Sequence, residues 1–314
     1  MKLRNWMLSA VAVLTLQVLG FPFSADAIAQ DKIRLLVLPF SESLASVIAQ
    51  KNGYFKEEGL DVELKKGGSA PEMLPLLVAK RADIILSNTV TTLQAIDQGL
   101  DATLIAPGAV ARTRAPDTTQ AMMVLKGAIR SPKGLKGKRI AVNVINSTAW
   151  LYTVAFLDKY GVSRKDVRFV EIPFPLMNDS LLNKQVDAIA QVEPFRTVLS
   201  DTGKVKVLGF PYVVVQPNCD ITQYIALSSW VRAHPAAARK FALAISKGAQ
   251  FANSHPAIAR DINQKFTGLN PALKDRVLLP LFGTAVNPKE INRTMELMVK
   301  YGLLKHKLDL SGKM

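Results

Sequence analysis

The sequence is poor in the residues that carry most thiol, metal and redox chemistry. It has one cysteine, Cys219, and three histidines in 314 residues. A single cysteine excludes an internal disulfide and a cluster of thiolate metal ligands. Because no cysteine follows the apolar run near the N-terminus, we also expect no lipid anchor. None of the histidines has a nucleophile close to it in the sequence, so we predict no catalytic residue, no metal site and no cofactor.

Long apolar stretches are also scarce. The one that stands out runs from Met7 to Leu19, follows a positive start at Lys2 and Arg4, and is too short to span a membrane comfortably. The sequence ADAIA at residues 25–29 contains two small-x-small cleavage motifs. We therefore expect residues 1–29 to be a cleaved signal peptide and the mature chain to be periplasmic, with no insertion into the membrane.

Acidic residues are outnumbered by basic ones, 25 against 40, which gives a formal net charge of +15. Export argues against nucleic acid as a partner, and there is no basic stripe with interleaved aromatic residues. The Lys and Arg residues are scattered along the predicted helices, as is typical of a solvated surface. The alternative is a positive field that favours anionic ligands, and the charge points slightly towards an organic anion.

One strand–turn–helix unit, residues 138–161, organises the rest of the chain. Ile140–Val144 is rich in β-formers, and Asn146, Ser147 and Thr148 are typical helix caps before a helix that Gly161 ends. In open parallel sheets, ligands bind beyond the carboxyl ends of the strands, because backbone N–H groups and the positive ends of helix dipoles point there. We therefore predict ligand contact at residues 146–148.

The same unit recurs after three other predicted strands, Ile33–Leu38, Asp83–Leu86 and Val186–Val192. The polar residues at these turns are Ser41, Ser43, Ser87, Asn88, Thr89 and Glu193. Any one turn can be purely structural, since Ser, Thr and Asn cap helices in most proteins. Glu193 in particular either accepts a hydrogen bond from a ligand or caps the helix that follows it. Four such turns together favour a ligand-binding cleft.

A family resemblance is carried by the run KNGYFKEEGLDVEL at residues 51–64, followed by GGSAPEMLPLLVAKRADIILSN at residues 67–88. These segments resemble the amino-terminal half of ABC-transporter substrate-binding proteins of the nitrate, sulfonate, taurine and thiamin-precursor type. The likeness continues through LKGKRIAVNVINSTAWLYTVAFLDKYGV, VDAIAQVEPF and RAHPAAARKFALAISKGAQFANSHPAIA. It thus covers essentially the whole mature chain.

The resemblance implies an α/β fold of the type II periplasmic binding protein class, in which two lobes, each a mostly parallel sheet flanked by helices, enclose a cleft. We expect lobe 1 to comprise residues 30–111 and 222–314, and lobe 2 residues 112–221. The chain loses apolar periodicity at 109–119 and has two prolines within 210–222, so these are the predicted crossings. Between them we predict a second sheet, with strands Ala121–Leu125, Ile140–Val144, Val167–Ile172, Asp187–Val192 and Val205–Leu208.

The resemblance further implies a monomeric receptor that closes on a small molecule and presents it to an ABC-transporter permease. The positions that correspond to the family's ligand contacts are Phe40, Ser41, Ser43, Ser69, Ser87, Asn88, Thr89, Asn146, Ser147, Thr148 and Glu193. Thiamin-precursor binders typically carry an aromatic residue and an acid where this chain has Leu36–Leu38, which argues against a stacked pyrimidine. Arg112 and Arg114, on the first crossing, are candidates for pairing with a carboxylate or sulfonate.

Two other functions stay open at this point. One is a secreted sensor that presents its ligand to a membrane receptor. The other is an enzyme of the same bilobal class. The iron-dependent pyrimidine synthases of this class use a cysteine cluster, which one cysteine excludes. The menaquinone-pathway type acts on cytoplasmic substrates, which the predicted export signal disfavours.

Overall fold

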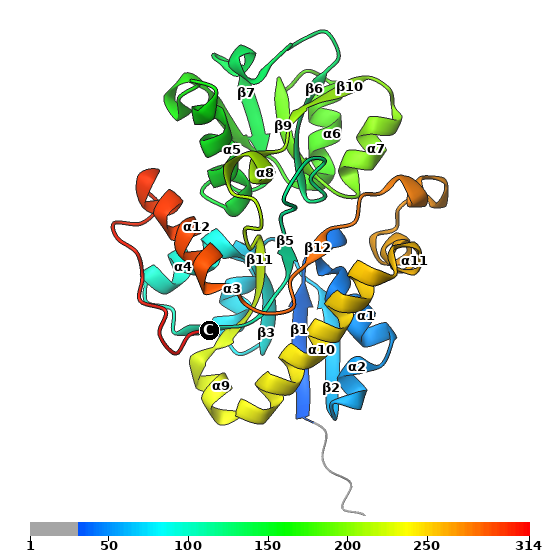
Figure 1. The fold of residues 1–314 in the computed structure, drawn as a ribbon, viewed down its shortest axis with the longest axis vertical. Helices are drawn as coiled ribbons and strands as arrows, with labels where there is room; N and C mark the ends of the chain where they lie inside the picture. The colour runs from blue at the N-terminus through cyan, green and yellow to red at the C-terminus, as the bar shows by residue number, and fades with distance from the viewer. Residues whose placement is uncertain (1–30) are drawn as a thin grey trace, which may run out of the picture.

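The computed structural model describes residues 31–314, so the predicted signal peptide, residues 1–29, lies outside the described residues. Figure 1 shows two α/β lobes stacked along the long axis, with lobe 1 below and lobe 2 above. Within residues 31–314, no helix combines the length and apolar character needed to cross a membrane.

Lobe 1 is built on a five-stranded sheet in the order β2-β1-β3-β11-β4. Its strands are β1 (Asp31–Val37), β2 (Leu60–Lys66), β3 (Ile84–Asn88), β4 (Ala102–Pro107) and β11 (Thr222–Leu227). β1 pairs in parallel with β2 and β3, whereas β11 is antiparallel to both β3 and β4. Ile84, Ile85 and Leu86 are all fully buried because helices cover both faces of the sheet. The position of β11 between β3 and β4 was not predicted.

Lobe 2 repeats this arrangement in a second five-stranded sheet, in the order β10-β6-β9-β7-β8. Its strands are β6 (Gln120–Leu125), β7 (Arg139–Val142), β8 (Arg168–Glu171), β9 (Ala188–Val192) and β10 (Val205–Gly209). β7 pairs in parallel with β8 and β9, and β6 lies antiparallel between β9 and β10. In each lobe, four strands therefore run one way, and the strand that follows a crossing, β11 or β6, runs the other way. The prediction of two mostly parallel sheets is confirmed, as are all five strands of the second sheet within a few residues.

Helices flank both sheets. Those that pack on lobe 1 are α1 (Leu44–Lys51), α2 (Tyr54–Glu57), α3 (Ala70–Val78), α4 (Thr89–Asp97), α9 (Ser228–Ala233), α10 (Pro235–Ser254) and α11 (Pro256–Thr267). Those that follow the strands of lobe 2 are α5 (Thr148–Lys159), α6 (Phe174–Leu182) and α7 (Phe195–Asp201). Gly248 lets α10 lie directly on α1, since a Cβ there would be 2.2 Å from the carbonyl oxygen of Ala45.

The connections between the lobes are partly regular. The first crossing starts with β5 (Ala109–Val110), which pairs antiparallel with β12 (Leu281–Phe282). The second contains a short helix, α8 (Pro211–Val215), which packs on α5 and which the sequence did not predict. The exact division of the chain between the lobes stays our proposal.

The C-terminal region contacts both lobes. Helix α12 (Pro288–Lys300) packs on α4 of lobe 1 and on α5 of lobe 2. On the α5 side, Lys300 Nζ lies 2.9 Å from the Asp158 carboxylate, and Tyr152 Oη is 3.0 Å from Thr294 Oγ1. A second contact joins Arg276, in the 3-10 helix Pro271–Arg276, to Asp201 at the end of α7. Because α5 lies between its own sheet, α8 and α12, residues 148–157 are all buried.

Candidate ligand-binding cleft

A cavity of about 330 Å³ lies between the two lobes. Its walls come from the segments that follow the carboxyl ends of the six parallel strands β1, β2, β3, β7, β8 and β9, together with Tyr212 of α8 and Ile221. The matching topology of the two sheets points these six strand ends at one another. This is the place where open α/β sheets bind ligands.

Two predicted residues join the lobes directly across this cleft. Asn88 caps α4, with its Oδ1 accepting from the Thr91 N–H at 2.9 Å. The same oxygen accepts from the backbone N–H of Thr148 at 3.2 Å and from its hydroxyl at 3.0 Å. Thr148 Oγ1 in turn accepts from the Val90 N–H at 3.0 Å. The starts of α4 and α5 thus satisfy each other's polar groups, and these hydrogen bonds join the two lobes.

The predicted residues fall into two groups. Those that line the cleft are Phe40, Ser69, Asn88, Ser147 and Thr148. Those that do not are Ser41, Ser43, Ser87, Thr89, Asn146 and Glu193, and neither Arg112 nor Arg114, which are exposed on the first crossing, belongs to the lining. Ligand contact stays a prediction for all of them.

Most of the second group have partners inside the protein. Ser43 Oγ donates to the Leu38 carbonyl at 2.6 Å, and Thr89 Oγ1 donates to the Asp220 carbonyl at 2.7 Å. Ser87 Oγ accepts from Thr92 Oγ1 at 2.9 Å. These hydroxyls shape the strand-to-helix turns and are fully buried. Capping and turn geometry therefore account for them, as the sequence allowed.

The glycine turn after β2 positions a carboxylate at the cleft. Glu72 Oε2 accepts a hydrogen bond from the backbone N–H of Ser69 at 2.8 Å, as in a capping box at the start of α3. A Cβ on Gly68 would lie 1.6 Å from that oxygen, so only glycine allows this return of the carboxylate. Gly68, Ser69 and Glu72 all line the cavity.

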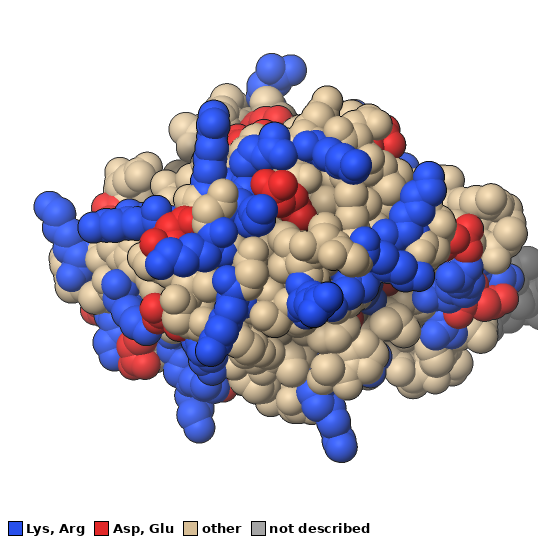
Figure 2. All heavy atoms as spheres, turned by 90° about the horizontal axis from the view of Figure 1, so that it is seen from above, with Lys and Arg blue, Asp and Glu red and all other residues tan. Residues whose placement is uncertain are grey.

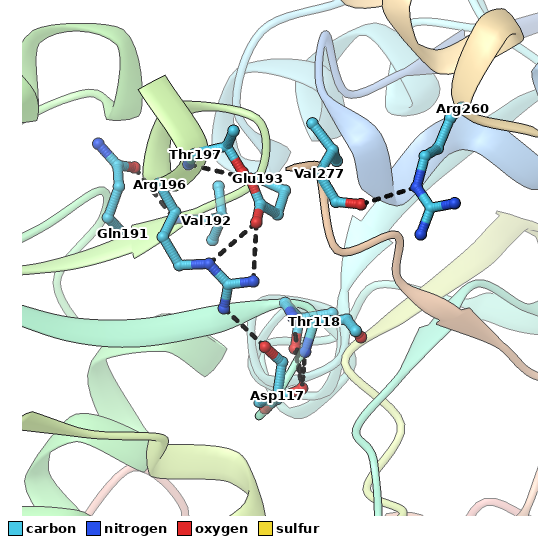
Figure 3. Close-up of polar contacts among 10 residues, drawn as sticks. Asp117, Thr118, Gln191, Val192, Glu193, Arg196, Thr197, Arg260 and Val277 are labelled. Atoms are coloured by element: carbon cyan, nitrogen blue, oxygen red, sulfur yellow. Dashed lines mark hydrogen bonds and ion pairs between the residues drawn. The ribbon is translucent and has the colours of Figure 1, made fainter. Parts of the chain in front are cut away.

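Glu193 lies outside the cleft because it is fully engaged elsewhere (Figure 3). Its Oε1 accepts from Arg196 Nε at 3.0 Å and from Nη2 at 2.7 Å, and its Oε2 accepts from the Thr197 N–H at 3.2 Å. Arg196 Nη1 also donates to the Asp117 carbonyl at 2.6 Å. The pair is buried and ties the start of α7 to the first crossing; it borders a second, smaller cavity of about 190 Å³.

The buried carboxyl in the cleft is Glu42, which lies between the predicted contacts Ser41 and Ser43 but was not itself named among them. Its side chain is only 7% exposed, and no residue of the described chain donates a hydrogen bond to its carboxylate. Burial, and then the charge of Asp117, raise the pKa of Glu42 to about 8. A buried carboxyl with no partner in the protein is complementary to a hydrogen-bond donor in the cavity.

The rest of the lining is acidic and aromatic. Glu72 and Glu171 are the other two carboxylates, and within residues 31–314 no Lys, Arg or His lines the cavity. Phe40 and Phe174 meet edge to face from opposite lobes with ring centroids 5.4 Å apart, and Tyr212 also lines the cavity. Asn143 adds a buried Oδ1 that has no partner in the described chain. Asn143, Glu171 and Phe174 were missed, although Asn143 directly follows β7, Glu171 ends β8 and Phe174 starts α6, and strand ends are the signal that found the other turns.

One named protein is related to this chain by sequence. The chain is 26% identical, over 174 residues, to a protein of Haemophilus influenzae named for thiamine biosynthesis; the match covers 55% of this chain and 53% of that protein, so it spans about half of the relative's length.

Two solved structures are similar along most of the chain. The alkanesulfonate-binding protein SsuA of Xanthomonas axonopodis pv. citri matches with a TM-score of 0.73 and 19% identity, over 87% of this chain and 94% of that one. The periplasmic nitrate-binding protein NrtA of Synechocystis matches with a TM-score of 0.73 and 13% identity, over 88% and 83%. These likenesses show the periplasmic binding protein fold. The model of the family described as NMT1/THI5 like matches residues 41–259, and the chain therefore belongs to the NMT1/THI5-like family.

Proposed function

We propose that this protein is the extracytoplasmic receptor of an ABC importer, and that its cargo is a small organic amine or an amino-substituted nitrogen heterocycle. The first part is supported by the family, by the two-lobed fold and by a cavity shared between the lobes. The second part rests chiefly on one observation, the buried and unpartnered Glu42 in a cavity without a Lys, Arg or His within the described residues.

The lining disfavours an anion. A sulfonate or carboxylate in the cleft would meet three glutamate side chains and no cation among residues 31–314, although Asn143 and the helix starts offer some dipoles. The preference for an anion, which the net charge of +15 suggested, is therefore not supported by the site. SsuA and NrtA are named for anions, but at 19% and 13% identity they share the fold with this chain and need not share its ligand.

An N–H-bearing ring suits the same lining. Ligand N–H groups would donate to Glu42, and the faces and edges of Phe40, Phe174 and Tyr212 would cover the ring. These residues supply the aromatic surface that Leu36–Leu38 lack, although Leu38 also lines the cavity. The name of the Haemophilus influenzae relative, which refers to thiamine biosynthesis, is compatible with an aminopyrimidine.

Binding and lobe closure are then one event. Hydrogen bonds to a charged group contribute roughly 1.5 to 3 kcal/mol each, so two or three, together with ring burial, reach the roughly 8 kcal/mol of a micromolar complex. The ligand would touch the turn after β1 in lobe 1 and the turn after β8 in lobe 2 only when the lobes meet. The closed monomer would dock on a transmembrane permease and would have no enzymatic role; a sensor that docks on a membrane receptor is the alternative.

The test is thermal stability of the mature protein with matched ligand sets. We expect a saturable rise in melting temperature with aminopyrimidines or arylamines, because a ligand that binds only the folded state stabilises it by about 2.7 kcal/mol at a hundredfold excess over Kd. Glu42→Gln should abolish that shift, whereas Glu63→Gln, on the lobe 1 surface, should keep it. A saturable shift with sulfonates or nitrate and none with amines would refute the proposed cargo. A shift with neither, in folded protein free of copurified ligand, would argue against the receptor function.

A further inference from the structure

We propose that the end of lobe 2 remote from the cleft is a docking surface for anionic phospholipid bilayers. Four loops form this end, and they lead into the amino-terminal ends of β7, β8, β9 and β10. The loops comprise residues 126–138, 163–168, 183–187 and 202–206. We call this surface the basic end of lobe 2. Figure 2, which looks down on it, shows Lys and Arg side chains spread over the face, with fewer acidic ones among them.

Hydrogen bonds to backbone carbonyls hold the four loops side by side. The Lys126 N–H donates to the Lys204 carbonyl at 2.8 Å, and the Gly137 N–H donates to the Asp166 carbonyl at 2.7 Å. The fourth loop joins through Arg139 Nη2, which donates to the Lys184 carbonyl at 2.9 Å. Residues that are up to 80 positions apart in the sequence therefore share one face.

The charge of this face is not neutralised within the protein. Only two carboxylates belong to the loops, and both are engaged: Asp166 with Lys136 at 3.8 Å and Asp187 with Arg139 at 3.1 Å. Ten further cations of the loops have no ion-pair partner among residues 31–314: Lys126, Arg130, Lys133, Lys138, Arg164, Lys165, Arg168, Lys184, Lys204 and Lys206.

The corresponding end of lobe 1 provides an internal comparison. There more of the cations form ion pairs, such as Arg34–Asp83 at 2.6 Å and Lys247–Glu58 at 2.6 Å, although Lys56, Lys80 and Arg81 have no ion-pair partner among residues 31–314. Asp101 is shared by Lys313 and Arg232. The two lobes have the same topology, so the excess charge of lobe 2 belongs to its surface and does not follow from the fold.

A lipid surface fits this face better than a protein partner does. Specific protein interfaces centre on apolar and aromatic side chains in packed pockets. The large apolar side chains that lobe 2 exposes are Ile145, Leu176, Val198 and Val207, and none of them belongs to the four loops. Lysines spread over exposed loops, without a pocket, are suited to a diffuse layer of anionic headgroups, where each basic residue contributes about fivefold to binding. The cleft lies at the opposite end of the lobe 2 sheet, so this docking is independent of the cargo and of the proposed function.

The experiment is co-sedimentation of the mature protein with vesicles at low salt. We expect binding to vesicles of phosphatidylglycerol and phosphatidylcholine in equal amounts, no binding to phosphatidylcholine alone, and release in 1 M NaCl, where the Debye length is about 3 Å. Replacing Lys133, Lys165, Lys184 and Lys204 with Glu should lower the partition coefficient about a thousandfold, since four factors of about five multiply. All four side chains are exposed, and an unchanged melting temperature would show that the variant is folded.

The matched control reverses the same number of charges on lobe 1, at Lys32, Lys51, Lys56 and Lys80, all of which are exposed. This variant has the same net charge and should bind the anionic vesicles within about threefold of the unchanged protein. An equal loss in both variants would overturn the proposal, because net charge alone would then govern binding. Binding to a soluble polyanion such as heparin without binding to anionic vesicles would overturn it as well, in favour of a macromolecular partner.

Discussion

The pH dependence of stability offers a direct test of the environment assigned to Glu42. Burial raises the pKa of its carboxyl from 4.5 to about 8 in the folded protein, and the unfolded chain keeps the lower value. The folded state therefore holds a proton between these two pKa values that the unfolded state has lost. Glu42 thus favours folding most at low pH, and its contribution declines as the pH rises from 4.5 through 8.

The magnitude between pH 6 and pH 9 follows from these two pKa values. In this window the Glu42 carboxyl loses its proton in the folded protein, whereas in the unfolded chain it is already ionised. Over the roughly two pH units between pH 6 and the folded pKa of about 8, this difference lowers the free energy of unfolding by roughly 2.5 kcal/mol. Burial raises the pKa of Asp220 to about 7. Over the same window its carboxyl therefore lowers the free energy of unfolding by a further amount of roughly 1.4 kcal/mol, which corresponds to about one pH unit. The lowered pKa values, such as that of Asp101 at about 2, belong to groups that titrate below this window.

The assay is urea unfolding of ligand-free protein at pH 6 and pH 9, followed by tryptophan fluorescence. Glu42→Gln should remove about 2.5 kcal/mol of the difference between the two pH values, and Asp220→Asn about half of that. Taking the difference between two pH values in each variant cancels any packing cost of the substitution itself. If Glu42→Gln keeps the full difference of the unchanged protein, the carboxyl is solvated or paired, and the argument for an N–H-bearing ligand loses its support.

Three further predictions concern closure, packing and ligand affinity. Thr148→Val removes the hydroxyl that bonds to Asn88 and to the Val90 N–H of lobe 1 across the cleft. The closed form of the ligand-free protein should then be about tenfold less favoured, and the radius of gyration in X-ray scattering should rise. Thr148→Ser, which keeps the hydroxyl, should restore the smaller radius. Gly248→Ala places a Cβ 2.2 Å from the Ala45 carbonyl oxygen and should lower the free energy of unfolding by about 1–3 kcal/mol, and an unchanged urea midpoint would contradict the packing of α10 on α1. A ligand that stays cationic must displace the Glu42 proton, so its affinity by calorimetry should rise up to tenfold per pH unit and level off above pH 8; an affinity independent of pH would mean that no ion pair forms there.

Local sequence determined the units of this fold. Alternating or continuous β-formers, a short polar turn and an amphipathic helix recur along the chain, and each unit depends on residues within about twenty positions of one another. Capping is equally local: Ser147 caps α5 and Asn88 caps α4, as the residue types predicted. The family resemblance supplied the order of these units in two lobes, and the fold confirms it.

Tertiary structure decided which polar residues are available to a ligand. Asn88 and Thr148 come from different lobes and bond to each other, which their separate turns could not reveal. Glu193 forms an ion pair with Arg196, which lies three residues later in the chain. That spacing was visible in the sequence, but the burial of both side chains was not. Glu42 shows the converse, since nothing in its serine-rich turn indicated that this carboxyl would be buried at the cavity without a hydrogen-bond partner in the described chain.

The same distinction applies to charge. The sequence determined the excess of 15 positive charges, and along the chain they appeared evenly scattered. Folding brings the starts of parallel strands to one end of each sheet, so lysines from four loops gather on lobe 2 while the carboxylates of the cleft gather at the opposite end. Electrostatic interactions depend on distance in space and on solvent exposure, both of which are fixed by packing. The sequence therefore determined how much charge this protein carries, and only the tertiary structure decided that its cleft is acidic.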